Sequence, residues 1–143
     1  MGAALTNRRF LAISDTSSGW REVHLNREDG APVEVELGAR IAFVIANRRI
    51  LGFDGPSGLM NEVRLRPREY IISSGVNERV GVIVTNVRAI GLAAGRAKPV
   101  EKSLHVQENF ESLRVLATTA SVRTTRRILV FQSSSGSWRG EEI

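Results

Sequence analysis

One short motif recurs along this chain at nearly constant intervals. The motif Asn-Arg-Arg-Phe-Leu begins at Asn7, Asn-Arg-Arg-Ile-Leu begins at Asn47, and looser copies begin at Asn86 and Thr125. The copies are 40, 39 and 39 residues apart. The chain therefore divides into units 7–46, 47–85 and 86–124 and a closing half unit 125–143. A fixed period of this length indicates supersecondary units stacked within a single domain, here 1–143.

Each unit contains two apolar stretches that meet at a turn. In one unit these are residues 41–45 and 50–53, separated by Asn47, and in the next they are residues 80–84 and 89–92. Both stretches are short and rich in β-branched and aromatic residues, and asparagine tolerates the backbone of a tight turn, so the pattern predicts β-hairpins. Because consecutive positions are apolar, we expect both faces of these strands to be covered.

Two further strands complete each unit. Glu62-Val63-Arg64-Leu65 alternates, which predicts a strand with Val63 and Leu65 turned inward. Weaker strands are expected near residues 33–37, 70–73 and 110–113. Residues 101–115 are the nearest approach to a helix, but their alignment with the other units favours strand. The unit is a four-stranded antiparallel meander.

In period, strand count and alternation the chain resembles β-propeller repeat proteins in general. The resemblance implies an all-β fold of tandem four-stranded blades. If each blade is counted from the weak strand through the hairpin to the strand that follows it, the first blade has three strands and each of the other three has four. A β-trefoil-like fold is the alternative, although a trefoil has three units and no use for a fourth copy. The chain lacks the Trp-Asp, kelch and Gln-x-Trp signatures, so no named family and no family site follows.

Three assemblies are compatible with four units. The ring closes within one chain, two chains join into a ring of eight units, or the chain is part of a longer propeller. Exposed edge strands at both ends would pair with other strands, so we expect a homo-oligomer.

The composition limits other classes of function. There are no cysteines, which excludes disulfides, a thiol nucleophile and cysteine metal sites. The N-terminus lacks the apolar core of a signal peptide, and no run approaches the eighteen apolar residues of a membrane span. We expect a soluble, cytoplasmic protein that does not bind membranes.

The repeated arginines are the strongest candidates for a binding site. One position is arginine in all four copies, and another arginine precedes it in three: Arg9, Arg49, Arg88 and Arg127, and Arg8, Arg48 and Arg126. Without these seven residues the net charge of +5 would become −2. A propeller would place them at one end of the molecule, where they could bind nucleic acid or an acidic glycan.

A structural role for these arginines is the alternative. Three glutamates, Glu22, Glu62 and Glu101, also recur at a fixed place in the unit and could pair with them. Because neighbours along a strand point to opposite faces, we expect most of the row of Arg9 to be structural and Arg8, Arg48 and Arg126 to be exposed.

Aromatic residues and histidines give weaker indications. Trp20 and Trp138 occupy the same place in their units and could form platforms for a sugar, as in a lectin, or pack over the sheet edge. His24 and His105 are not in metal-ligand spacing, so we expect no metal site. No cofactor motif and no activated nucleophile is evident.

These patterns predict a non-catalytic scaffold or interaction module that assembles with itself or with a protein partner. Binding of a polyanion through the arginines is the second hypothesis, and sugar binding is the third. The sequence does not indicate an enzyme.

Overall fold

The structure is a computed structural model that describes residues 1–30 and 33–143. Within these residues the chain forms fifteen strands in four antiparallel sheets. The first sheet contains β1 (Gly2–Leu5), β2 (Arg9–Ile13) and β3 (Arg21–His24). The second contains β4 (Glu34–Leu37), β5 (Ile41–Ile45), β6 (Arg49–Asp54) and β7 (Leu59–Arg64).

The last two sheets repeat this four-stranded order. The third contains β8 (Ile71–Val76), β9 (Val80–Thr85), β10 (Arg88–Ala93) and β11 (Val100–Ser103). The fourth contains β12 (Phe110–Val115), β13 (Thr119–Thr124), β14 (Arg127–Gln132) and β15 (Ser137–Glu142). A single turn of 3-10 helix, η1 (Arg27–Asp29), connects the first two sheets. No helix in the described part of the chain is long and apolar enough to cross a membrane.

The all-β fold, the hairpins and the distribution of strands among the units are confirmed. The turn at Asn47 brings Ile45 opposite Ile50, and the corresponding turn in the third sheet brings Val84 opposite Ala89. The segment 101–115 forms parts of β11 and β12, not a helix.

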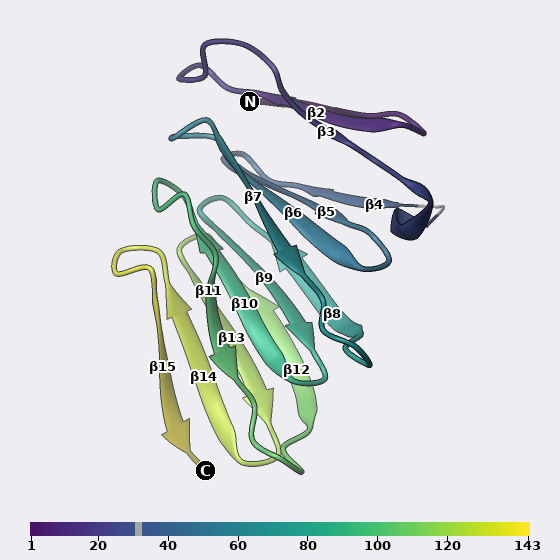
Figure 1. The fold of residues 1–143 in the computed structure, drawn as a ribbon. Coiled ribbons are helices and arrows are strands. Elements are labelled where there is room, and N and C mark those ends of the chain that lie inside the picture. Colours follow the sequence, from purple (N-terminus) through teal and green to yellow (C-terminus); the bar gives the residue numbers. More distant parts are fainter. Residues whose placement is uncertain (31–32) are drawn as a thin grey trace.

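The sheets stack face to face in chain order, as in a β-propeller (Figure 1). Three apolar clusters lie between neighbouring sheets, one at each of the three boundaries. The first strands of the later sheets are the inner strands, since β8 contacts both β4 and β12. Figure 1 shows the termini at opposite ends of the stack, and no hydrogen bond, ion pair or core cluster of the described residues joins the first sheet to the fourth. The four sheets form an open arc.

Glycines on one sheet make room for large side chains of the next. A Cβ atom on Gly91 would lie 2.9 Å from ring atoms of Phe131, and one on Gly81 would lie 2.3 Å from the ring of Phe43. Gly52 accommodates Leu92 in the same way. These contacts let the sheets approach closely, and they explain why the middle strands of the second and third sheets are buried on both faces.

Candidate functional site

Three of the repeated arginines are buried at the boundaries between sheets. Arg49, Arg88 and Arg127 are the first residues of β6, β10 and β14, and they are 9%, 6% and 8% exposed. Their strands lie within the stack, and an isolated charge in such a place would be costly. Each guanidinium therefore needs partners from the neighbouring chain segments.

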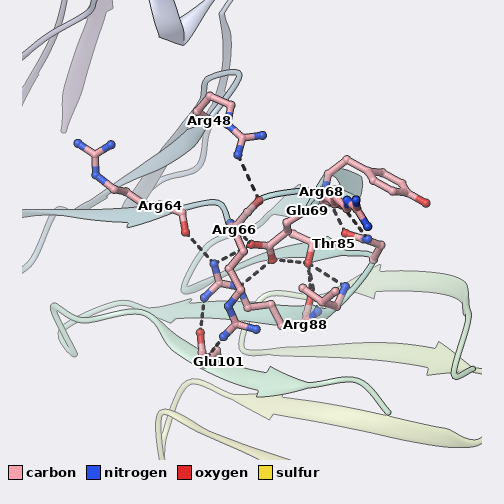
Figure 2. A network of polar contacts seen from close by, with 11 residues as sticks. Arg48, Arg64, Arg66, Arg68, Glu69, Thr85, Arg88 and Glu101 are labelled. Atoms are coloured by element: carbon pink, nitrogen blue, oxygen red, sulfur yellow. Dashed lines mark hydrogen bonds and ion pairs between the residues drawn. The ribbon is translucent and has the colours of Figure 1, made fainter. Parts of the chain in front are cut away.

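Arg88 shows the arrangement (Figure 2). Its Nε and Nη2 donate to the two carboxylate oxygens of Glu69 at 2.8 and 2.9 Å, and Nη2 also donates to the carbonyl oxygen of Arg64 at 2.9 Å. Thr85 Oγ1 donates to Glu69 at 2.7 Å, and Arg88 Nη1 contacts Glu101. Glu69 lies in the connector between the second and third sheets, and Arg64 ends β7. The arginine thus links its own sheet to the connector and to the outer strand of the preceding sheet.

We call this arrangement a clamp: an arginine is held by a connector carboxylate and by a backbone carbonyl of the preceding sheet. The same clamp occurs at the other two boundaries. Arg49 donates to Asp29 at 2.7 and 2.8 Å and to the His24 carbonyl at 2.7 Å. Arg127 donates to Glu108 at 2.9 and 2.8 Å and to the carbonyl of Ser103, the last residue of β11, at 3.1 Å. Bidentate pairs of this kind are among the stronger hydrogen bonds in proteins.

The clamps fix the protonation of their carboxylates. The hydrogen bonds from Arg127 and then Thr124 outweigh burial and lower the pKa of Glu108 from 4.5 to about 2. The Arg49 hydrogen bond likewise lowers the pKa of Asp29. Burial by itself would raise the pKa of Glu69, but hydrogen bonds from Arg88 and its other donors together lower it. All three carboxylates are charged at neutral pH and are poorly suited to general acid or base catalysis.

The first sheet has no clamp in the described part of the chain. The side chain of Arg9 is 49% exposed, and its ion pair is with Glu22 of its own sheet at 3.3 Å. Among the described residues, its guanidinium donates to no connector carboxylate and to no carbonyl oxygen of another sheet. Arg9 is the one member of its row that is available to a partner.

The other row of arginines lies at the hairpin turns. Arg8 and Arg126 are exposed, and Arg48 is half-buried with Nη2 donating to the Arg66 carbonyl at 3.3 Å. Arg66 and Arg68 of the neighbouring connector are exposed at the same end of the stack, and Figure 2 shows both with Arg48. Binding of an anion by any of the seven repeated arginines stays a prediction, and the buried clamps direct it toward this exposed row.

The connector carboxylates were missed in the sequence. Asp29, Glu69 and Glu108 are spaced by 40 and 39 residues, which is the period of the arginines, so the signal was present. The glutamates that the sequence did indicate are secondary partners. Glu62 lies 3.5 Å from Arg49. Glu101 contacts Nη1 of Arg88, the guanidinium nitrogen that Glu69 does not bind.

The two tryptophans occupy different environments. Trp138 packs on Phe131 with ring centroids 5.0 Å apart, and its Nε1 donates to the Val100 carbonyl at 2.8 Å. Trp20, just before β3, is 57% exposed. The structure does not bring the two together, and their use as sugar platforms stays a prediction.

The two histidines, His24 and His105, lie at the surface, and His24 Nε2 is 3.4 Å from Glu22. Among the described residues, no group of three or more histidine, aspartate or glutamate side chains is placed to hold a metal ion. A cleft of about 780 Å³ between the second and third sheets includes Asp29 and Glu69, whose carboxylates are already held in clamps.

Comparisons with known proteins show likeness in shape and not in sequence. No family model matches the chain, and no curated protein matches it. It is similar to the extracellular domain of the putative one component system BT4673 from B. thetaiotaomicron, with 8% identity and a TM-score of 0.46, over 97% of this chain and 23% of that chain. It is also similar to the N-terminal domain of Nup159, with 9% identity and a TM-score of 0.40, over 99% of this chain and 47% of that chain. The chain thus spans less than half the length of either, and its all-β, propeller-like architecture follows from its own sheets.

Proposed function

We propose that this protein is a non-catalytic scaffold or interaction module of the β-propeller type, which assembles with a second copy through its first sheet. The observation that carries the proposal is the outward face of that sheet. Leu11 and Ile13 lie there beside Arg9 and are only partly covered. Their counterparts in the second sheet, Leu51 and Phe53, are fully buried against the first sheet.

This outward face has the small and apolar residues that are typical of an internal boundary. The small residues Gly2 and Ala4 of β1 lie in the places of Ala42 and Val44, which belong to the buried cluster between the first and second sheets. Apolar surface of this kind gains free energy when it is covered. The face is therefore suited to a partner sheet more than to water.

A second copy is a self-complementary partner for this face. Arg9 and Glu22 lie 3.3 Å apart on it. A two-fold axis would place the arginine of each copy near the glutamate of the other, and it would bury Leu11 and Ile13 of both copies. The contact is isologous and produces a dimer.

The oligomeric state tests this proposal. We expect light scattering coupled to gel filtration, at about 50 µM protein, to show a dimer, since weaker contacts escape detection at lower concentration. Leu11→Asp should give a monomer with an unchanged circular dichroism spectrum. Val130→Asp, on the outward face of the fourth sheet, is the matched control and should leave the dimer intact.

Two outcomes would contradict the proposal. A wild-type protein that is monomeric at this concentration would remove the second copy as the partner. Loss of the dimer in Val130→Asp as well as in Leu11→Asp would indicate a head-to-tail ring of eight sheets instead of a contact between first sheets.

Binding of an anionic polymer is the second candidate function. It is favoured by the arginines at the hairpin end of the stack, where Arg48 donates to the Arg66 carbonyl and Arg68 lies in the same connector, although the guanidinium of Arg66 itself lies 3.6 Å from Glu101 (Figure 2). Arginine side chains recognise phosphate and carboxylate groups through paired N–H donors. The test is a salt-dependent polyanion titration, described in the Discussion.

A further inference from the structure

In the residues that the structure describes, the first sheet has no strand in the place of the inner strand that each of the other sheets contains. In those sheets the inner strand pairs with the second strand: β4 with β5, β8 with β9 and β12 with β13. In the first sheet β1 corresponds to the second strands β5, β9 and β13, and it pairs with β2 alone in the described part of the chain. The other edge of β1 is open.

Backbone groups on this edge are available for pairing. The Thr6 N–H donates to the Arg9 carbonyl, so the alternation of an antiparallel ladder directs the N–H and C=O groups of Ala3 and Leu5 away from β2. In the second sheet the counterparts of these two residues, Phe43 and Ile45, are paired with β4. An open edge of this kind accepts a further strand.

Apolar side chains surround the same open position. Leu5, Val35 and Leu37 are 37%, 38% and 56% exposed, and none of them belongs to a core cluster. Val35 and Leu37 are on β4, the inner strand of the next sheet. Their counterparts are Ser74 and Val76 in the third sheet and Leu113 and Val115 in the fourth, and the three apolar ones pack into the clusters between sheets. What covers those counterparts is the inner strand of the preceding sheet.

We propose that this open position is a binding site for an extended segment of a partner polypeptide, which adds to β1 as an antiparallel strand and covers Val35 and Leu37. Addition of a strand to an open edge combines main-chain hydrogen bonds for affinity with side-chain pockets for specificity. The site is the edge of the first sheet and is separate from its outward face. The inference therefore goes beyond assembly of the protein with itself.

The later boundaries specify the chemistry of the segment. A Cβ atom on Gly75 of β8 would lie 2.9 Å from Val115 Cγ2, and one on Gly38 would lie 2.6 Å from Val76 Cγ1. Gly75 thus leaves room for the next inner strand, but Gly38 lies just after β4, and the β4 residue in the register of Gly75 is Glu36, whose carboxylate accepts from Ser74 at 2.8 Å. By the same register, the partner residue opposite Ala3 lies over Leu37, which has no donor for a carboxylate, so the small residue of β8 fits this place better than the glutamate of β4. Residues on either side of it should be apolar, as Val35 and Leu37 are on either side of Glu36.

A peptide copied from this chain provides the probe. Residues 70–77 contain β8, whose Gly75 would lie opposite Ala3. We expect this peptide, fluorescently labelled, to bind the protein saturably in an anisotropy titration. The same peptide with Gly75→Leu should bind at least about tenfold more weakly, because the larger side chain meets Leu37.

Variants of the protein locate the site. Ala3→Pro removes an N–H from the open edge without removing a hydrogen bond to β2, so peptide binding should be lost. Leu37→Glu places a charge where the peptide packs and should also abolish binding. Ile128→Glu is the matched control, because Ile128 is a similarly exposed apolar residue on the fourth sheet. It should bind the peptide as the parent protein does.

Amide hydrogen exchange gives a readout that nonspecific adhesion would not. The amides of Ala3 and Leu5 should become protected when the peptide is added, whereas the amide of Ala4, which faces β2, should change little. Absence of binding by the parent peptide at about 1 mM would overturn the proposal, since even a weak complex is populated there. Equal binding of the parent and Gly75→Leu peptides, or binding without protection of Ala3 and Leu5, would overturn it as well.

The monomeric variant separates this inference from the proposed dimer. Leu11 lies on the outward face and not on the open edge, so Leu11→Asp should still bind the peptide. If the parent protein binds the peptide but is not a dimer, the strand site is supported and self-assembly is rejected. If it is a dimer but does not bind the peptide, self-assembly is supported and the strand site is rejected.

Discussion

The two ends of the stack present different surfaces. On the outward face of the first sheet, Leu11 and Ile13 follow the pattern of an internal boundary. On the outward face of the fourth sheet, β13 carries Ser121 and Arg123, and Arg123 donates to Glu111 at 3.1 Å. The counterparts of these two residues at internal boundaries are large or β-branched apolar residues: Phe43 and Ile45 in the second sheet and Val82 and Val84 in the third.

The two end sheets differ in how suitable their outward faces are for exposure to water. Repeat proteins remain soluble when a terminal unit exposes a polar outer face. On the fourth sheet β13 supplies polar residues to the outward face, although Ile128 and Val130 of β14 are apolar there, whereas β1 of the first sheet supplies no polar side chain. This asymmetry is the reason for which we propose assembly through the first sheet, and the predictions below test it from the largest expected effect to the smallest.

Removal of an arginine should be far more costly inside the stack than at its first sheet. Arg88→Ala leaves Glu69 buried and charged without its partner, so we expect a loss of about 3–5 kcal/mol in the free energy of unfolding. Arg9→Ala removes one exposed ion pair and should cost no more than about 1 kcal/mol. Urea unfolding followed by circular dichroism measures both. Equal losses would show that Arg9 is buried in solution, for instance within an assembly, and would weaken the contrast.

Acid should weaken the last boundary through Glu108. Because its pKa is lowered from 4.5 to about 2, its contribution is complete above pH 4.5 and is lost as the pH falls toward 2. The difference corresponds to about 3 kcal/mol at neutral pH. Unfolding measured across this range should show the loss, and Glu108→Gln should be less stable at pH 7 and should lack this part of the dependence. A parent protein whose stability is constant from pH 5 to about pH 2 would contradict the clamp.

Placing the apolar residues of an internal boundary on the outward face of the fourth sheet should create a second surface for association. The double change Ser121→Val and Arg123→Val gives β13 the residues of β9 at these positions. We expect species larger than the parent's in light scattering, because the apolar patch is enlarged. Combination with Leu11→Asp shows which face is responsible. An unchanged mass would mean that the polar residues do not protect this end.

The period alone was enough for much of the fold. It predicted the strands because each unit repeats the same alternation. It also predicted a structural role for most of the row of Arg9 and the exposure of Arg8 and Arg126, but the predicted exposure of Arg48 is wrong, since Arg48 is half-buried. It did not predict the clamp partners, since Asp29, Glu69 and Glu108 lie in connectors about twenty residues before their arginines. The partner of a connector residue depends on how neighbouring sheets stack.

Burial at the ends of the stack could not be read from the sequence either. Trp20 and Trp138 occupy the same place in the repeat, but Trp138 has β11 of the preceding sheet beside it and Trp20 has no preceding sheet. The same reason explains why Arg9 differs from Arg49. Repeat position specifies the direction of a side chain, and the neighbouring sheet decides whether that side chain is covered.

The smallest effect on stability, and the one that separates the two candidate functions, concerns the exposed arginines of the hairpin end. The triple change of Arg48, Arg66 and Arg68 to serine removes charges that are largely in water, so the free energy of unfolding should change by no more than about 0.5 kcal/mol per site. If this end binds an anionic polymer, affinity for heparin should fall with the logarithm of salt concentration in the parent, and the triple variant should show a shallower slope because fewer counterions are released. The matched control changes three exposed basic residues at the opposite end, Arg40, Arg96 and Lys98, and alters the net charge equally. Equal slopes in the two variants would mean that net charge alone attracts heparin, and the interaction module would then stand without a polyanion site.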